Sequence, residues 1–424
     1  MMKIRVAVIG CGAAGLCALR HLTARPELFD AVGFEQLNNV GGTWNYTDKI
    51  GTYDNGIPVQ SSMYKNLRTN LPKEVMAFPD YPFPSNLPSF VSHEVVLKYL
   101  ENYCEHFNLQ QYIKLETRID KVEPIEGENQ TEWKVTSTCD GTTECNKFDS
   151  VIVCNGHYAV PLLPEIPGMD KFTGTIVHSH NYRVPEEFKD QVVICLGAGS
   201  SGQDICLDIA TSAKQVILSH NNTPLVTPLP SNVSQKPGIS ELTADSVVYK
   251  DNTVEKIDVL LLCTGYKYDF PFLDDVCKVG IMDERVTPLY KHIIHAKYPS
   301  LSFIGICKQI CPFPQFQNQV QFVLSMLDKS QSLPSYEAML VDIDRDFNER
   351  LGRGLPTRYA HHMGMAQWDY NDAIAHLGGF QTIPKVWKAM YAQVSARRKE
   401  NLITYKKRQY DIVDNVLFKE KLDV

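Results

Sequence analysis

Apolar residues change their spacing in the same way at two places in the chain. Residues 3–9 form a short, largely apolar run of the kind that becomes a buried strand, and a glycine-rich turn follows at once. After the turn, Leu16, Leu19 and Leu22 recur at helical spacing. The same succession begins again at residue 192 and continues to Ile209. The pattern therefore predicts two strand–turn–helix units.

Both turns have the sequence G-x-G-x-x-G, and both stand between a predicted strand and a predicted helix. In such a turn the first glycine permits the tight bend, the second lets a diphosphate approach the backbone, and the third allows close packing. The helix N-terminus then offers free N–H groups to the phosphates. We predict two dinucleotide sites, formed by Gly10, Gly12, Ala14 and Gly15 in the first turn and by Gly197, Gly199, Ser200, Ser201 and Gly202 in the second.

The two predicted sites differ in the residue that would meet the ribose. Glu35 lies 20 residues beyond Gly15, after a strand-like run, where an acid suits the free ribose hydroxyls of a dinucleotide such as FAD. The second unit has no acid there; its strand ends in Ser219 and His220. Neither residue would repel a 2′-phosphate, although the arginine that usually binds one is also missing. The pattern favours NADPH and leaves NADH open.

The remaining pattern predicts an α/β fold with two dinucleotide-binding, Rossmann-like domains. Apolar strands that break at a glycine occur at residues 151–156 and 259–265, where each nucleotide-binding unit would end, and another follows at residues 299–305. The pattern therefore predicts that the second unit is inserted into the first. We predict an FAD domain at residues 1–163 and 283–424 and an NADP domain at residues 164–282, with a mainly helical C-terminal part.

Composition excludes several classes of partner. The net charge is −7 and no basic block dominates, so nucleic acid is not expected as a partner. No run of about 18 apolar residues is present, so no membrane span or anchor is expected. The 12 cysteines include no Cys-x-x-Cys pair and many stand in strand-like runs. Together these features predict a cytoplasmic protein, unless a secretion signal is removed before residue 1. We also expect a homo-oligomer.

At this point the residues resemble one family. The segment Phe172-x-Gly174-x-x-x-His178-x-x-x-Tyr182, placed between the two glycine turns, is similar to the identifying sequence of the flavin-containing monooxygenases, which are class B flavoprotein monooxygenases. Further similarities extend from residue 10 to about residue 320. They include Gly42, Thr43 and Trp44, which resemble the turn beside the flavin, and residues 263–266, which resemble the end of a domain-switch strand.

The resemblance implies a reaction and two further site residues. NADPH would reduce bound FAD, dioxygen would give a flavin hydroperoxide, and a soft nitrogen or sulfur nucleophile would be oxygenated. Asn70 matches an asparagine that hydrogen-bonds near the flavin, which makes it the candidate catalytic residue, although it could instead cap a turn. Gln319 matches a glutamine at a helix start that faces the flavin, or is an ordinary polar helix position. If the segment is helical, His178 and Tyr182 share one face; they would lock the domain junction or, alternatively, take part directly in catalysis.

The resemblance also suggests a substrate and leaves rivals open. A short chain without an anchor looks like the insect members, such as the senecionine N-oxygenases, so detoxification of a pyrrolizidine alkaloid by N-oxidation is expected. The ending Tyr182-Arg183 disfavours Baeyer–Villiger chemistry. The alternatives are an NAD(P)H oxidase that releases peroxide, a flavin disulfide reductase, which would need a redox cysteine pair, and a flavin-binding module without activity.

Overall fold

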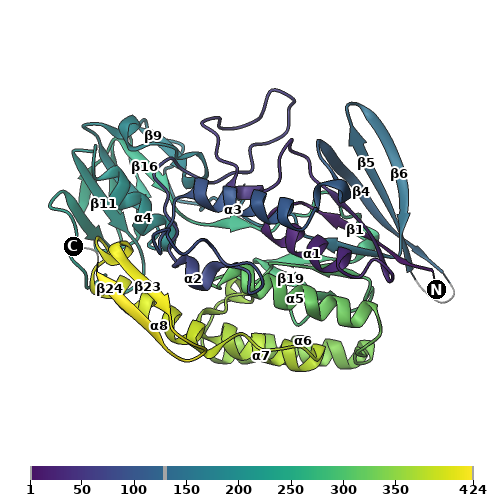
Figure 1. Ribbon diagram of the computed structural model, residues 1–424. Coiled ribbons are helices and arrows are strands. Elements are labelled where there is room, and N and C mark those ends of the chain that lie inside the picture. Colours follow the sequence, from purple (N-terminus) through teal and green to yellow (C-terminus); the bar gives the residue numbers. More distant parts are fainter. Residues whose placement is uncertain (1, 128–130, 423–424) are drawn as a thin grey trace.

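The computed structural model describes residues 2–127 and 131–422 and contains two main sheets, the first mixed and the second parallel, each built around one of the glycine turns (Figure 1). The first sheet has the order β20-β21-β22-β7-β1-β2-β3. Its central strand β1 (Ile4–Ile9) pairs in parallel with β2 (Phe29–Phe34) and β7 (Ser150–Val153). The remaining strands are β3 (Ile113–Lys114), β20 (Leu289–Tyr290), β21 (Ile294–His295) and β22 (Leu301–Phe303).

The second sheet repeats the plan of the first. Its order is β12-β11-β10-β16-β9, and β10 (Val192–Leu196) pairs in parallel with β11 (Gln215–Ser219) on one side and β16 (Val259–Leu262) on the other. The outer strands are β9 (Thr175–His178) and β12 (Val233–Lys236). Every residue of β7 and of β16 is buried, which explains why both strands are unbroken apolar runs rather than alternating ones.

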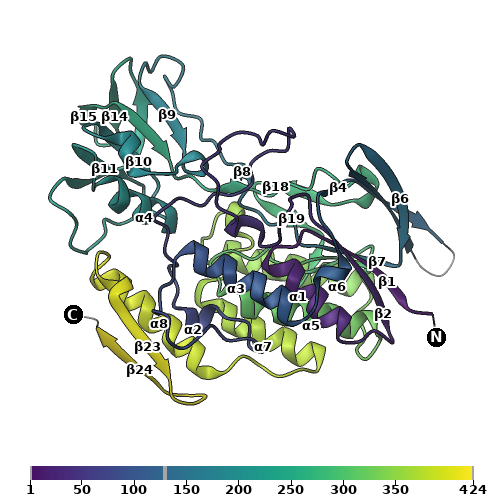
Figure 2. The ribbon, with the colours of Figure 1, turned by 45° about the horizontal axis from the view of Figure 1, so that its top comes forward.

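We call the parts of the molecule built around the first and the second sheet the first and the second lobe. Small antiparallel sheets extend both lobes. The largest consists of β4 (Thr117–Glu126), β5 (Thr131–Cys139) and β6 (Thr142–Phe148), and it projects from the end of the first lobe that lies away from the second lobe (Figure 2). The others are formed by β8 (Val160–Pro161) with β17 (Tyr266–Lys267), β13 (Ile239–Leu242) with β14 (Ser246–Tyr249) and β15 (Val254–Lys256), and β18 (Gly280–Met282) with β19 (Arg285–Thr287).

Helices pack on the first sheet, and one helix begins in the glycine turn of the second sheet. Helix α1 (Ala13–Thr23) begins in the first glycine turn, lies on the sheet, and packs against α5 (Pro312–Leu327). Helix α4 (Ser200–Ile209) begins in the second glycine turn. The other helices are α2 (Lys73–Met76), α3 (His93–His106), α6 (Tyr336–Gly352), α7 (Gln367–Gly378) and α8 (Lys385–Glu400).

The C-terminal segment joins the two lobes. It consists of α8 and the hairpin of β23 (Arg408–Ile412) and β24 (Phe418–Leu422), drawn in yellow beside α2 and α4 in Figure 2. Its apolar cluster holds Trp387 and Met390 of α8, and Leu207 of α4 packs against that cluster. A salt bridge of 2.5 Å between Lys406 and Asp204 ties the segment to the second lobe. Residues 385–422 therefore contact both lobes.

The structure confirms the predicted α/β class, both strand–turn–helix units, and the return of the chain to the first sheet, because β22 pairs in parallel with β7. His178 and Tyr182 do not share a helix face, because residues 178–182 are not α-helical: His178 ends β9, and a single 3-10 turn, Ser179–Asn181, precedes Tyr182. The predicted domain boundaries stay predictions.

Candidate dinucleotide-binding sites

The carboxyl ends of the parallel strands meet at one edge of each sheet, where open α/β sheets bind their ligands. At the edge of the first sheet, Gly10 follows β1, Glu35 follows β2 and Cys154 follows β7. At the edge of the second, Gly197 follows β10, His220 follows β11 and Cys263 follows β16. The two edges therefore present equivalent sets of loops.

The two glycine turns share one mode of packing. Gly10 has φ +92°, and a Cβ there would lie 2.7 Å from the carbonyl oxygen of Cys154; Gly197 has φ +113°, and its Cβ would lie 2.5 Å from that of Cys263. The last glycine of each turn is equally confined, since a Cβ on Gly15 would stand 1.8 Å from its own turn's first carbonyl oxygen. Both turns thus present a helix N-terminus at the sheet edge.

Glu35 is held against the first turn. Its Oε2 accepts a hydrogen bond from the backbone nitrogen of Cys11 at 2.9 Å, and its Oε1 accepts one from Leu37 at 3.0 Å. Burial raises the pKa of this carboxyl, and backbone hydrogen bonds from Leu37, Cys11 and Gln36 act against that shift. A ribose hydroxyl that donated to this carboxylate would further favour the charged form.

The predicted flavin-side turn closes over the first glycine turn. Gly42, Thr43 and Trp44 form a short 3-10 helix, and the Gly42 Cα lies 3.4 Å from where a Cβ on Gly12 would stand. Any larger residue at Gly42, which has φ +57°, would come within 2.9 Å of the Gly12 backbone. The close approach of the two turns therefore requires glycine at Gly42.

Buried polar atoms without partners gather on the segments around this edge. Among the described residues no hydrogen bond is made by Thr43 Oγ1, His157 Nε2, Gln317 Oε1 or Asn318 Nδ2. His157 lies shortly beyond β7, and Gln317 and Asn318 lie in the first half of α5, which follows β22. Buried polar groups are almost always paired, so a polar ligand bound here would supply hydrogen-bond partners for these atoms. The residues present fit FAD.

The second turn differs from the first in having open space. A Cβ on Gly202 would lie 1.8 Å from the Gly197 oxygen, whereas one on Gly199 would meet no atom within 4 Å. Ser200 and Ser201, which begin α4, are both exposed. The position where a diphosphate approaches the backbone is therefore accessible, and the turn fits a nicotinamide dinucleotide.

The structure places the two predicted ribose-side residues of the second site in the interior. The Ser219 side chain is fully buried and its hydroxyl donates to the carbonyl of Pro237 at 2.7 Å. His220 is 6% exposed; its Nε2 lies 3.3 Å from Gln235 Oε1, and its Nδ1 has no partner among the described residues. The Ser219 hydroxyl is thus already engaged, and only the His220 Nδ1 remains unpaired.

The two residues taken from the resemblance lie in contrasting surroundings. Asn70 is exposed and follows the buried Thr69. Gln319 is fully buried in the middle of α5, not at its start, which corrects the expected position. Its Oε1 accepts from the Gly305 nitrogen at 2.9 Å and its Nε2 donates to the Tyr370 hydroxyl at 3.0 Å. Gln319 therefore fixes the loop after β22, and its amide is already paired.

His178 and Tyr182 connect elements rather than face an open site. His178 Nε2 lies 3.1 Å from the Gly265 carbonyl, and burial lowers the pKa of this imidazole to about 4. The Tyr182 hydroxyl donates to Asp208 on α4 at 2.6 Å, and its ring contacts that of Tyr64. These contacts support the structural role over direct catalysis.

Sequence reasoning missed two arginines. Arg183 is 3% exposed and donates to backbone carbonyls on both sides of the lobe junction, including those of Thr47 at 2.7 Å and His180 at 2.7 Å. Arg398 on α8 donates to the Ser200 hydroxyl at 3.2 Å. The sequence signal for Arg183 was its place beside Tyr182, whereas nothing in the sequence joins Arg398 to the second turn.

Comparison with known proteins decides the family. The model of the family described as "Flavin-binding monooxygenase-like" matches residues 3–229 and 226–390, nearly the whole chain. The chain belongs to this family. Its members and structural neighbours use FAD and NADPH, so the predicted cofactors and oxidoreductase class are confirmed.

The relatives of this flavin-binding monooxygenase are similar along their whole length. "Flavin-containing monooxygenase FMO GS-OX-like 4" from Arabidopsis thaliana is 38% identical over 422 residues, covering 95% of this chain and 93% of the relative. The solved structure of S-allyl-L-cysteine S-oxygenase from Allium sativum is 38% identical with a TM-score of 0.89, covering 96% and 95%. That of Tmm from a Pelagibacter strain is 28% identical with a TM-score of 0.85, covering 95% and 93%.

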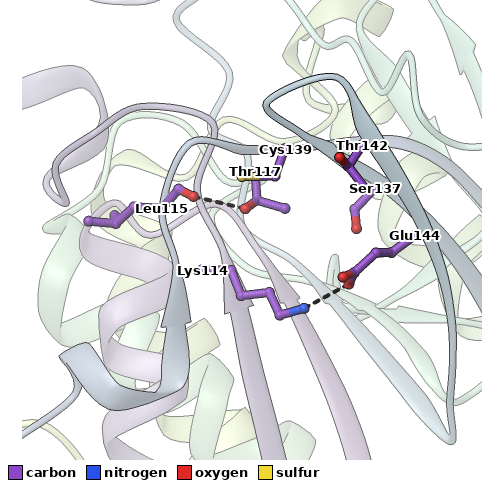
Figure 3. Close-up of a pocket in the computed structure, with 7 residues that line it drawn as sticks. All are labelled: Lys114, Leu115, Thr117, Ser137, Cys139, Thr142 and Glu144. Carbon is purple, nitrogen blue, oxygen red and sulfur yellow. Dashed lines mark hydrogen bonds and ion pairs between the residues drawn. The ribbon is translucent and has the colours of Figure 1, made fainter.

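Other features of the flavin-binding monooxygenase lie outside the two sites. A pocket beside β3 is lined by no predicted site residue, and its Lys114 and Glu144 form a salt bridge of 3.0 Å across it (Figure 3).

Within the described residues, none of the helices has the length and apolar character needed to span a bilayer. Burial raises the pKa of Cys307 to about 12 and also raises that of Cys311, so thiolate chemistry of a disulfide reductase is disfavoured there.

Proposed function

We propose that this flavin-binding monooxygenase S-oxygenates a small thioether. The observation that carries the proposal is the likeness to S-allyl-L-cysteine S-oxygenase, which extends over 96% of the chain at a TM-score of 0.89. A thioether sulfur is a soft nucleophile of the kind the family oxygenates. The balanced reaction consumes one thioether, one dioxygen, one NADPH and one proton, and gives one sulfoxide, one NADP⁺ and one water.

The chain's own residues hold and orient the cofactors. The Gly10–Gly15 turn and the N-terminus of α1 would bind the FAD diphosphate, and Glu35 would accept from the ribose hydroxyls. The Gly197–Gly202 turn and α4 would bind the diphosphate of NADPH. Bound FAD, once reduced by NADPH, supplies the activation of dioxygen. Thr43 and Asn318, whose buried polar atoms lack partners, would hydrogen-bond the flavin.

Asn70 is the proposed catalytic residue. Its side chain is exposed, and no hydrogen bond of this side chain is found within residues 2–127 and 131–422. Its amide is therefore free to donate to and accept from groups that arrive with the cofactor. An amide suits this role because it does not titrate near neutral pH.

The deciding experiment measures products against consumed coenzyme. Purified FAD-loaded protein is mixed with NADPH, dioxygen and S-allyl-L-cysteine, and NADPH, sulfoxide and hydrogen peroxide are quantified. One sulfoxide per NADPH with little peroxide would support the proposal. One peroxide per NADPH with no sulfoxide would overturn it in favour of the NAD(P)H oxidase alternative.

A parallel arm uses a tertiary amine. The predicted N-oxygenation of a pyrrolizidine alkaloid, and with it the suggested closeness to the insect enzymes, would be favoured if senecionine were oxygenated faster than the thioether at equal concentration. We also propose that the protein is cytoplasmic and forms a homo-oligomer. Size-exclusion chromatography with light scattering would test the oligomeric state.

A further inference from the structure

We propose that Arg398, at the end of α8, binds the diphosphate of the nicotinamide coenzyme and supplies the cation that the second glycine turn lacks. The inference rests on the proposed use of that turn for NADPH. It assigns a coenzyme contact to the C-terminal segment, which lies about 200 residues away from the turn in sequence.

Arg398 is anchored at the mouth of the second turn. Its Nη1 donates to the Ser200 hydroxyl at 3.2 Å, and its Nε donates to Gln203 Oε1 at 3.2 Å. Gln203 in turn donates from Nε2 to the carbonyl of Ala198 inside the turn at 2.8 Å. The guanidinium is thus positioned by the first helical residue of α4 and by a side chain that braces the turn itself.

The charge of Arg398 has no counter-ion in the described part of the chain. Its hydrogen-bond partners, Ser200 and Gln203, are both neutral. By contrast, the neighbouring Arg397 forms salt bridges of 2.8 Å with Glu400 and 2.9 Å with Glu420. Two adjacent arginines on one helix therefore differ: one is neutralised by carboxylates and the other is not.

The surroundings make an unpaired cation unfavourable at this place. The N-terminus of α4 carries the positive end of its helix dipole, and no acidic residue stands in its first turn. Lys406 lies nearby; burial lowers its pKa, and the charges of Arg398 and Arg68 add to that shift, whereas Asp204, which forms a salt bridge with Lys406, opposes it. Within the described residues these positive groups outnumber the carboxylate that pairs with Lys406, and an anion would relieve the excess positive charge.

The space for that anion is present. A Cβ at Gly199 would meet no atom within 4 Å, and Ser201 is exposed, so a phosphate can reach the turn beside the guanidinium. The buried His220 Nδ1, at the end of the adjacent strand, also lacks a partner. Because Arg398 contacts the start of α4 rather than the end of β11, the geometry favours the diphosphate over the 2′-phosphate. Arginine binds phosphate oxygens in a bidentate manner.

The test measures coenzyme binding directly. NADP⁺ and NAD⁺ are titrated into the FAD-loaded protein, and dissociation constants are obtained by calorimetry for the wild type, Arg398→Met, Arg398→Lys and Lys399→Met. Lys399 is exposed on the same turn, so Lys399→Met removes the same charge without touching α4. Thermal unfolding and FAD content of each variant verify folding.

We expect Arg398→Met to raise both dissociation constants about tenfold or more, since a charge-assisted contact to a phosphate is lost. Arg398→Lys should recover part of the affinity, and Lys399→Met should change neither constant more than about twofold. A weaker dependence of NADP⁺ affinity on salt in Arg398→Met would also support the inference.

Two results would overturn it: unchanged binding in Arg398→Met, or a loss confined to NADP⁺, which would place the guanidinium at the 2′-phosphate. The outcome is separable from the proposed function. A protein that binds NADP⁺ through Arg398 but forms no sulfoxide supports this inference and overturns S-oxygenation. A protein that forms sulfoxide and binds NADP⁺ equally well after Arg398→Met supports S-oxygenation and overturns this inference.

Discussion

The backbone nitrogen of Cys11 donates a hydrogen bond to Glu35 Oε2 at 2.9 Å. This contact joins the acid after β2 to the glycine turn after β1, so the group that would bind a ribose is positioned by the loop that would bind the diphosphate. The same relationship explains why the acid and the turn can be separated by 20 residues in sequence yet serve one nucleotide.

Glu35→Gln should weaken FAD binding. The amide keeps an acceptor for Cys11 but loses the charge that strengthens hydrogen bonds from the ribose hydroxyls, at a cost of about 1.4 kcal/mol, or about tenfold in affinity. The release of FAD, followed by its fluorescence on dilution, measures the change. Glu116→Gln, which removes an exposed carboxylate nearby, serves as the control. Equal FAD retention in Glu35→Gln and the wild type would remove Glu35 from the site.

FAD affinity should also depend on pH through Glu35. Burial raises the pKa of this carboxyl in the free protein, and ribose donors favour the charged form, so FAD binding lowers the pKa and releases a proton. Affinity should therefore fall as the pH drops through the raised pKa and level off above it. The dissociation constant measured between pH 5 and 8 checks this, and Glu35→Gln should lose the slope. A variant with the wild-type slope would assign the titration to another group.

The glycines of the second turn offer a matched pair. Gly202→Ala places a Cβ 1.8 Å from the Gly197 oxygen and should lower the free energy of unfolding by about 1–3 kcal/mol. A Cβ at Gly199 would meet no atom within 4 Å, and Gly199 has φ −71°, which alanine adopts readily. The free energy of unfolding of Gly199→Ala should therefore stay within about 0.5 kcal/mol of the wild type. Its methyl group would nevertheless occupy the path of the diphosphate.

Binding and stability should therefore separate in this pair. Chemical denaturation of the FAD-loaded variants gives the stability, and NADP⁺ titration gives the affinity. We expect Gly199→Ala to weaken NADP⁺ binding about tenfold while it unfolds like the wild type. Wild-type NADP⁺ affinity in a well-folded Gly199→Ala would show that the diphosphate does not approach the backbone at this turn.

Features that depend on local pattern could be predicted from the sequence. The strand, the turn and the helix of each unit follow from apolar spacing and from glycines confined by neighbouring backbone, as at Gly10 and Gly197. The buried strands β7 and β16 follow from continuous apolar runs. These elements already bring Gly10, Glu35 and their equivalents in the second lobe to the sheet edges.

Features that depend on distant contacts could not be predicted. No periodicity indicates that Arg398 would reach Ser200, or that the Ser219 hydroxyl would donate to Pro237. The resemblance places Gln319 at a helix start, yet α5 already begins at Pro312. Proline is tolerated in the first turn of a helix, so Pro312 and Pro314 lie inside α5 and Gln319 falls in its middle.

Asn70→Asp should reduce oxygenation more than it reduces FAD content. The wild-type side chain is exposed, so the protein should fold and retain FAD, whereas a carboxylate beside the flavin cannot donate a hydrogen bond and adds negative charge where reduction also adds it. We expect the rate of sulfoxide formation per bound FAD to fall about tenfold or more, which is about 1.4 kcal/mol in the barrier. Asn86→Asp makes the same change at another exposed asparagine and should leave the rate unchanged. Equal rates in both variants would exclude Asn70 from the reacting site, and a loss of FAD that matched the loss of rate would make it a cofactor-binding residue only.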